Sequence, residues 1–149
     1  MYVAYDPITF LVKWTVDDPA PEGQEEVMKN QPDPWFSCPS TTVIDKLVAI
    51  TPDGPALVPK PRVTLVATKT SILANGLDHT IISAVIEGEL PGNVPKFDIE
   101  IFEASSGSKL SLPLADPRVE FVTDTPGKFT FAVTDMRFMA TNILEVVAS

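Results

Sequence analysis

Cys38 and His79 are the only cysteine and histidine in the chain, so they form its one candidate thiol–imidazole pair. A cysteine activated by a histidine is a nucleophile for acyl transfer, but catalytic families surround these residues with local signatures. Cys38 stands beside a proline in a polar stretch, and His79 opens an alternating segment. A lone histidine is more often structural or exposed. We therefore predict no catalytic residue and no enzymatic activity.

Carboxylates are the other side chains with chemical potential. Asp98 and Glu100 lie two residues apart, and with Glu103 they fall on or beside the outer face of one predicted strand. Two such groups could share a divalent cation with a carboxylate from a neighbouring loop, although a solvated strand face explains them more simply. One cysteine and one histidine are too few for a structural zinc site, and no phosphate-binding glycine loop is present. We predict no metal and no cofactor.

Large apolar residues near the N-terminus are better candidates for function. Alternation along residues 10–16 predicts that Phe10, Val12, Trp14 and Val16 share one strand face. A two-stranded hairpin cannot bury such a face alone, so the face packs on the following domain or on another chain. Aromatic residues within a polar loop fill a core or an interface. The candidate partner-binding residues are Phe10, Val12, Trp14, Val16, Trp35 and Phe36.

These residues belong to a predicted N-terminal arm, residues 1–55. Residues 2–16 have the pattern of a β-hairpin around a turn at residues 6–9. Residues 17–41 are acidic and broken by prolines, which predicts an extended connector with one helical turn at residues 24–29. A strand is expected at residues 41–50, and residues 56–61 are expected to be a stiff lead-in to the second half.

The remainder, residues 56–149, has the regular spacing of an all-β domain. Short alternating runs are separated by turn residues, among them Asn75-Gly76 and residues 105–108. Residues 97–103 alternate most clearly, with Phe97, Ile99 and Ile101 predicted inward. The pattern is typical of an antiparallel β-sandwich. The expected strands are 63–67, 79–87, 97–103, 109–114, 119–123, 128–134 and about 139–148.

Composition agrees with a mainly β protein and excludes some partners. Fifteen prolines and seven glycines in 149 residues argue for strands and extended segments. A formal net charge of −9, with only eleven scattered basic residues, argues against a nucleic-acid partner. No apolar run approaches the roughly 18 residues of a membrane span. The first residues do not have the pattern of a signal peptide, so we expect none.

Residues 62–149 resemble bacterial invasin/intimin-type immunoglobulin-like domains. The segment Ala74-Asn75-Gly76-Leu77-Asp78 matches the Ala-Asn-Gly-x-Asp element between the first two strands of those domains. Residues 125–131 are similar to their later Gly-x-Tyr/Phe-x-Phe/Val strand, and residues 142–148 to their closing strand. Residues 89–95 depart from the family, which has a Gly- and Asn-rich insertion there. Independently of the resemblance, Gly76 and Asn75 suit a sharp turn that Asp78 can brace through backbone N–H groups.

The resemblance implies an immunoglobulin-like β-sandwich and a protein of adhesins or bacteriophage virions. Without a signal peptide, we expect a virion structural protein, such as a tail-fibre or baseplate accessory or a capsid decoration protein. Its arm would dock on other virion proteins, and a host surface glycan or protein is a further candidate partner. The alternative is a bacterial cell-surface adhesin-type or carbohydrate-binding module, using loop tips at 73–78 and 105–109. By analogy with phage appendages we also consider a homo-oligomer, although no heptads enforce one.

Overall fold

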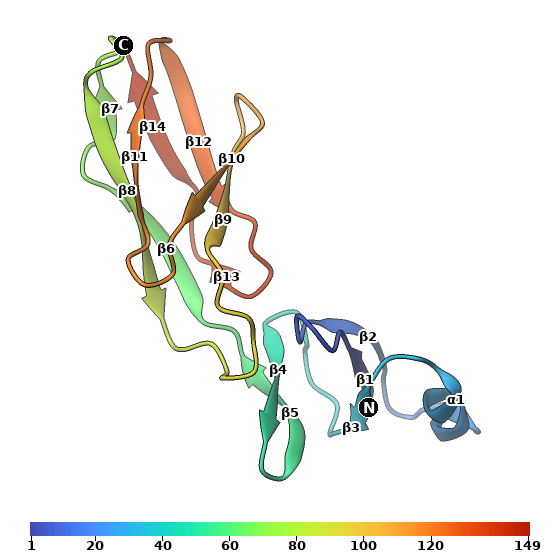
Figure 1. Cartoon of the computed structure of the whole chain (residues 1–149). Helices are drawn as coiled ribbons and strands as arrows, with labels where there is room; N and C mark the ends of the chain where they lie inside the picture. The colour runs from blue at the N-terminus through green and yellow to red at the C-terminus, as the bar shows by residue number, and fades with distance from the viewer. The chain divides into compact units, whose positions relative to one another are not determined.

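The computed structural model describes all residues, 1–149 (Figure 1), and the protein is mainly β with one short helix. The chain divides into two compact units. Unit 1 comprises Met1–Lys60 and Glu89–Pro95, and unit 2 comprises Pro61–Gly88 and Lys96–Ser149. The segment Glu89–Pro95 therefore leaves unit 2 between two of its strands and packs with unit 1. That residues 1–55 serve as an attachment region stays a prediction.

Unit 1 contains two small sheets and the helix. The predicted hairpin is confirmed, and a third strand extends it into a sheet with the order β2-β1-β3. A separate antiparallel pair is formed by β4 and β5. In the view of Figure 1 the helix α1 and the β4–β5 pair lie on different sides of the three-stranded sheet. The elements are β1 (Tyr2–Tyr5), β2 (Val12–Val16), α1 (Gln24–Asn30), β3 (Trp35–Ser37), β4 (Lys46–Thr51) and β5 (Gly54–Pro59).

Within the predicted connector at residues 17–41 the helical turn is confirmed, but the expectation that the rest is a simple extended linker is wrong. The middle of the connector forms α1, which is longer than the expected single turn and buries Met28 completely. Its second half forms β3 because β1 has an open edge beside it. The ladder continues past β3 at both ends, where Tyr5 N donates to Pro34 O and Cys38 N donates to Met1 O. The prolines lie outside these elements and do not interrupt them.

The predicted lead-in at residues 56–61 is also wrong, since most of it is the strand β5. The turn between β4 and β5 is fixed by the Thr51 hydroxyl, which donates to Gly54 O and accepts from Asp53 N. Gly54 has a φ of 107°, which favours glycine. The other edge of β4 is held by Asn93, which donates to Val48 O and accepts from Ile50 N. The segment Glu89–Pro95 is thereby joined to unit 1.

Unit 2 consists of two sheets. The first has the strand order β10-β9-β12-β14-β7 and the second has the order β11-β8-β6-β13. The predicted strands at 63–67 and 79–87 are confirmed. The strands of this unit are β6 (Arg62–Ala67), β7 (Ser71–Ile72), β8 (His79–Glu87), β9 (Ile99–Glu103), β10 (Ser108–Leu112), β11 (Arg118–Val122), β12 (Gly127–Val133), β13 (Met139–Ala140) and β14 (Leu144–Ala148).

Two features of unit 2 differ from the predicted all-antiparallel arrangement. The pairs β13–β6 and β14–β7 are parallel. The expected final strand at about 139–148 is divided between the two sheets as β13 and β14. Asn142 lies at the break, where its side chain accepts from Leu65 N and donates to Leu65 O. These two hydrogen bonds take the place of strand pairing at Asn142, where the chain passes from one sheet to the other.

Aromatic rings from both sheets meet in the interior of unit 2. The Phe121 ring of β11 lies 5.0 Å from the Phe129 ring and 5.0 Å from the Phe131 ring, both of β12. Phe131 is fully buried, as are Leu65, Ile82 and Ile101. The hydrophobic core of this unit is therefore shared by the two sheets.

Candidate binding surface

Trp14 and Trp35 lie on the same face of the three-stranded sheet. Both are paired with Ala4 of the central strand, Trp14 from β2 and Trp35 from β3. Paired residues share a face, and Tyr2, two residues before Ala4, shares it too. The Tyr2 and Trp35 rings contact each other edge to face, with centroids 5.8 Å apart. Ala4 is fully buried while the three aromatic residues are half-buried.

A register shift in the pairing of β1 with β2 places the predicted apolar residues of β2 on two different faces of the sheet. Between Ala4 and Tyr5 the pairing shifts, so that Tyr5 is opposite Val12 and not Lys13. Val12 therefore falls on the face opposite to Trp14. Phe10 precedes the strand with a φ of 60° and stacks on Tyr5 at 6.1 Å. The prediction that Phe10, Val12, Trp14 and Val16 share one face is wrong on this point.

The second aromatic group is centred on Tyr5. Phe36 contacts the Tyr5 ring edge to face at 6.0 Å, and Phe10 stacks on it at 6.1 Å. Phe10 O also accepts from Val48 N, so this side of the sheet adjoins β4. The candidate residues thus form one aromatic group around Ala4 and another around Tyr5.

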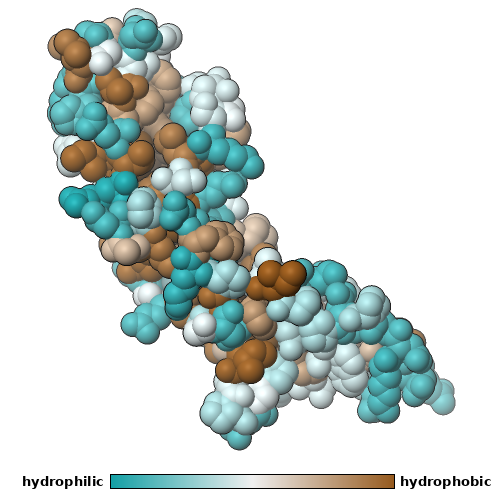
Figure 2. All heavy atoms as spheres, in the orientation of Figure 1, coloured by the Kyte–Doolittle hydropathy of each residue, from teal (hydrophilic) through white to brown (hydrophobic).

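A shallow depression of about 450 Å³ lies between Tyr2 and the helix α1. Glu25 and Glu26 are in the first turn of α1, and Lys29 in its last turn pairs with Glu25. The surface over α1 is hydrophilic in Figure 2. The aromatic group around Ala4 therefore has an acidic neighbour. The lining residues are Tyr2, Ala20, Pro21, Gly23, Gln24, Glu25, Glu26 and Lys29.

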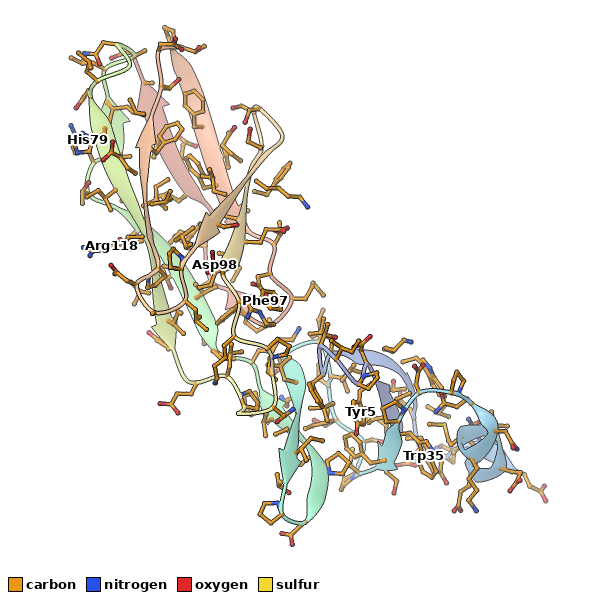
Figure 3. The ribbon with its side chains drawn as sticks, in the orientation of Figure 1. Tyr5, Trp35, His79, Phe97, Asp98 and Arg118 are labelled. Atoms are coloured by element: carbon orange, nitrogen blue, oxygen red, sulfur yellow. The ribbon has the colours of Figure 1, made fainter.

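The two residues of the candidate nucleophile pair belong to different units. Cys38 follows β3 in unit 1, and burial raises the pKa of its thiol, which disfavours the reactive thiolate. His79 belongs to unit 2, where it begins β8, is exposed and projects from the ribbon in Figure 3. No group of three or more His, Cys, Asp or Glu side chains lies close enough to hold a metal ion.

Glu103 is a structural residue, contrary to its predicted place at the outer face. Its side chain points inward with Ile99 and Ile101 and is only 3% exposed. The carboxylate accepts hydrogen bonds from the backbone and hydroxyl groups of both Ser105 and Ser106. Burial alone would raise the pKa of Glu103, but these hydrogen bonds lower it to about 2. Glu103 therefore fixes the turn after β9.

The alternating pattern also predicts that Phe97 points inward, and this prediction is wrong. It precedes β9 and is 59% exposed. One side of its ring contacts the Arg137 guanidinium, 4.0 Å from the ring centroid. Arg137 is buried, pairs with Asp135 at 2.6 Å and donates to the carbonyls of Phe97 and Asp98. The exposed ring is thus held by a buried cation.

The loop at residues 73–78 is rigid and apolar at its tip. Asn75 Oδ1 accepts from the backbone N–H groups of Leu77 and Asp78, and Asp78 accepts from Leu73 N and pairs with Lys69. These bonds confirm the predicted bracing role of Asp78. Leu77 is 83% exposed and Leu73 is 56% exposed. The loop therefore presents two leucines on a fixed backbone.

Neither a protein-family model nor a curated protein matches the chain. The helix α1 is too short to cross a membrane, and it is the only helix. The partner-binding role of the candidate residues, the family resemblance and the virion setting accordingly stay predictions.

Sequence patterns missed two residues of the aromatic group around Ala4. Tyr2 falls within the predicted hairpin, but the sequence pattern does not mark it as a binding residue. Ala4 is not marked either, because its place in the group depends on its pairing with Trp14 on one side and Trp35 on the other. The short run at residues 35–37, with two aromatics in a row, was the available signal for β3. It was obscured by the prolines before and after it.

Proposed function

We propose that the chain is a non-enzymatic structural protein of a bacteriophage particle, with unit 2 an immunoglobulin-like sandwich. Support for this fold comes from the two sheets of unit 2 and from the phenylalanine rings that meet between them. The segment that carries the family resemblance, residues 74–78, lies in a hydrogen-bonded turn between β7 and β8, which is compatible with the proposed fold. The particle would carry the protein as a tail-fibre or baseplate accessory or as a capsid decoration.

Unit 1 attaches the protein to other virion proteins in this proposal. The observation that carries it is the aromatic group of Tyr2, Trp14 and Trp35, which remains partly exposed around the buried Ala4. Tryptophan and tyrosine are the residues that most often dominate the binding energy of protein interfaces. The adjoining acidic helix α1 would favour a basic partner surface. Unit 2 would be displayed or would bridge to a neighbour.

Presence in the particle is tested first. Phage particles produced by the genome that encodes the chain are purified by density gradient and analysed by mass spectrometry. The protein should sediment with the particles at a constant ratio to the capsid protein. Recovery of the chain only in the soluble fraction would contradict the proposal.

Attachment through unit 1 is tested with Trp35→Ala, complementing a particle that lacks the wild-type chain. Incorporation should fall severalfold, because the variant removes one ring of the aromatic group. Phe97→Ala is the matched control, an exposed aromatic truncation in unit 2 that should incorporate normally. Circular dichroism establishes that both variants are folded. Normal incorporation of folded Trp35→Ala would exclude this aromatic group as the anchor.

A cell-surface adhesin-type or carbohydrate-binding module is the second candidate function. The observation in its favour is the rigid loop at residues 73–78, since a preordered loop loses little entropy on binding. Leu77→Asp should then abolish binding of the purified protein to bacterial cells, while Gly92→Ala should not. Glycan-array binding would distinguish a sugar ligand from a protein ligand.

A further inference from the structure

The strand β11 forms an edge of its sheet, and its backbone groups alternate between two directions. Ala84 N donates to Pro117 O, which makes this pair and every second pair along β8 and β11 a hydrogen-bonded pair. Val119 and Phe121 therefore direct their N–H and C=O groups toward β8. Arg118, Glu120 and Val122 direct theirs away from the sheet.

No strand is hydrogen-bonded to the open side of β11, although β10 of the other sheet lies near this strand. The sheet order places β8 on one side of β11 and nothing on the other. Arg118 N is bonded to Asp116 O at 2.8 Å, so Arg118 offers its C=O to a further strand, and Glu120 and Val122 offer both their N–H and C=O groups. An edge of this kind is a template for pairing with another chain.

The charges of β11 favour a second copy of the same strand as that partner. Residues with outward backbone groups pair with each other, and side chains directly opposite interact. An antiparallel self-pairing centred on Val119 places Arg118 opposite Glu120 of the second copy, twice by symmetry. Centring on Glu120 would place two glutamates opposite each other, and centring on Arg118 would place two arginines opposite each other. Only the first arrangement joins unlike charges.

The competing contact of Arg118 is weak. Its guanidinium pairs with Asp116 at 2.8 Å, but the two side chains are 60% and 66% exposed, and such surface pairs contribute little. Arg118 projects from the ribbon in Figure 3, and exchanging its exposed pair with Asp116 for a contact with a second chain would cost little. The edge strand of the other sheet, β10, is different. Its outward backbone belongs to Lys109 and Ser111, and a lysine there opposes self-pairing.

We propose that β11 is a self-association edge, through which two copies of the chain join their sheets antiparallel with reciprocal Arg118–Glu120 pairs. This inference does not depend on the phage role, and it names a partner that can be tested with purified protein alone. Because the paired strands are short, the dimer is expected to be weak and to form at high local concentration.

Sedimentation equilibrium of the full-length protein tests the proposal. The wild type should show a monomer–dimer equilibrium in the micromolar to millimolar range. Arg118→Glu and Glu120→Arg should each weaken the dimer by about tenfold or more, because each places like charges opposite one another twice. The double variant Arg118→Glu/Glu120→Arg restores unlike pairs and should restore the dimer. Lys109→Glu, with the same charge change on β10, should leave it unchanged.

Amide hydrogen exchange gives a second measurement on the wild type, which does not depend on the folding of any variant. The Glu120 amide should exchange more slowly as concentration rises, while the Phe121 amide, directed toward β8, should not change. A wild type that stays monomeric at millimolar concentration would overturn the proposal. So would a dimer that resists both charge reversals, or a double variant that is not restored.

Discussion

The two units bury their apolar surface in different ways. In unit 2 two sheets share a continuous core in which Phe131, Leu65 and Ile101 are fully buried. In unit 1 the residues of largest size, Trp14 and Trp35, are only half-buried, and the fully buried positions are held by smaller side chains, namely Val3, Ala4, Met28, Leu47 and Val48. Unit 1 also depends on Asn93 and on backbone bonds at its margins.

This difference indicates where stability and binding are separable. Truncating a buried residue in unit 2 should act on folding alone. Truncating a half-buried aromatic in unit 1 should act on folding to a smaller extent and on attachment as well, since the same ring serves both. The predictions below test this contrast from the largest expected effect to the smallest.

Phe131→Ala should have the largest effect on stability. The side chain is fully buried and its ring contacts that of Phe121 at 5.0 Å, so its loss should cost about 3–5 kcal/mol of unfolding free energy. Urea denaturation followed by circular dichroism measures the loss. Phe97→Ala, which removes an exposed ring, should cost less than about 1 kcal/mol. Equal losses for the two variants would contradict the account of the unit 2 core.

Glu103→Gln should destabilise unit 2 at neutral pH by about 2 kcal/mol, because the turn after β9 loses its charged hydrogen-bond acceptor. The effect should depend on pH. The folded-state pKa of about 2 lies below the ordinary value of 4.5, so the contribution of the carboxylate is complete above about pH 4.5. It should be lost as the pH falls toward 2. Denaturation of wild type and variant from pH 7 to 2 should therefore converge, and a constant difference would refute this role.

Trp14→Ala should lower the unfolding free energy by about 1–3 kcal/mol, less than Phe131→Ala, because the ring is half-buried beside Ala4. The conservative variant Trp14→Phe should retain most of the stability. Denaturation followed by the fluorescence of the remaining Trp35 reports on unit 1. A loss as large as that of Phe131→Ala would mean that Trp14 is a core residue and would weaken its candidacy as an anchor.

Gly76→Ala should have the smallest effect, about 1 kcal/mol. Gly76 has a φ of 71°, which disfavours residues with a Cβ, while the added atom would meet only Asp124 Cβ at 3.9 Å. Gly92→Ala is the matched control, because Gly92 has no positive φ and no neighbour within 4 Å. Thermal denaturation compares the two variants. An unchanged midpoint for Gly76→Ala would show that the loop at 73–78 relaxes without cost.

Local patterns predicted the parts of the fold in which local preference and tertiary pairing agree. The alternation at 79–87 and the turn at Asn75-Gly76 were sufficient because strand and turn chemistry act within a few residues. The mainly β character also followed from proline content and β-branched residues. These features need no knowledge of the distant partner.

The remaining parts depend on contacts between residues far apart in the sequence. β3 exists because β1 offers an edge, and residues 35–37 alone do not contain that information. Glu103 points inward, although a charged residue is expected on the outer face of a strand, because five hydrogen-bond donors satisfy its carboxylate. The register shift at Ala4 and Tyr5 likewise arises from the pairing, and it separated Val12 from Trp14. The candidate set therefore included Trp14, Trp35, Phe10 and Phe36 but not their grouping with Tyr2 and Tyr5.

Residue-resolution imaging of the native phage particle tests the central claim most directly. The account predicts density for the chain on the particle, with Tyr2, Trp14 and Trp35 of unit 1 buried against another virion protein. Absence of the chain from the particle would contradict the proposed function, and attachment through unit 2 with this aromatic group exposed to solvent would contradict the anchor.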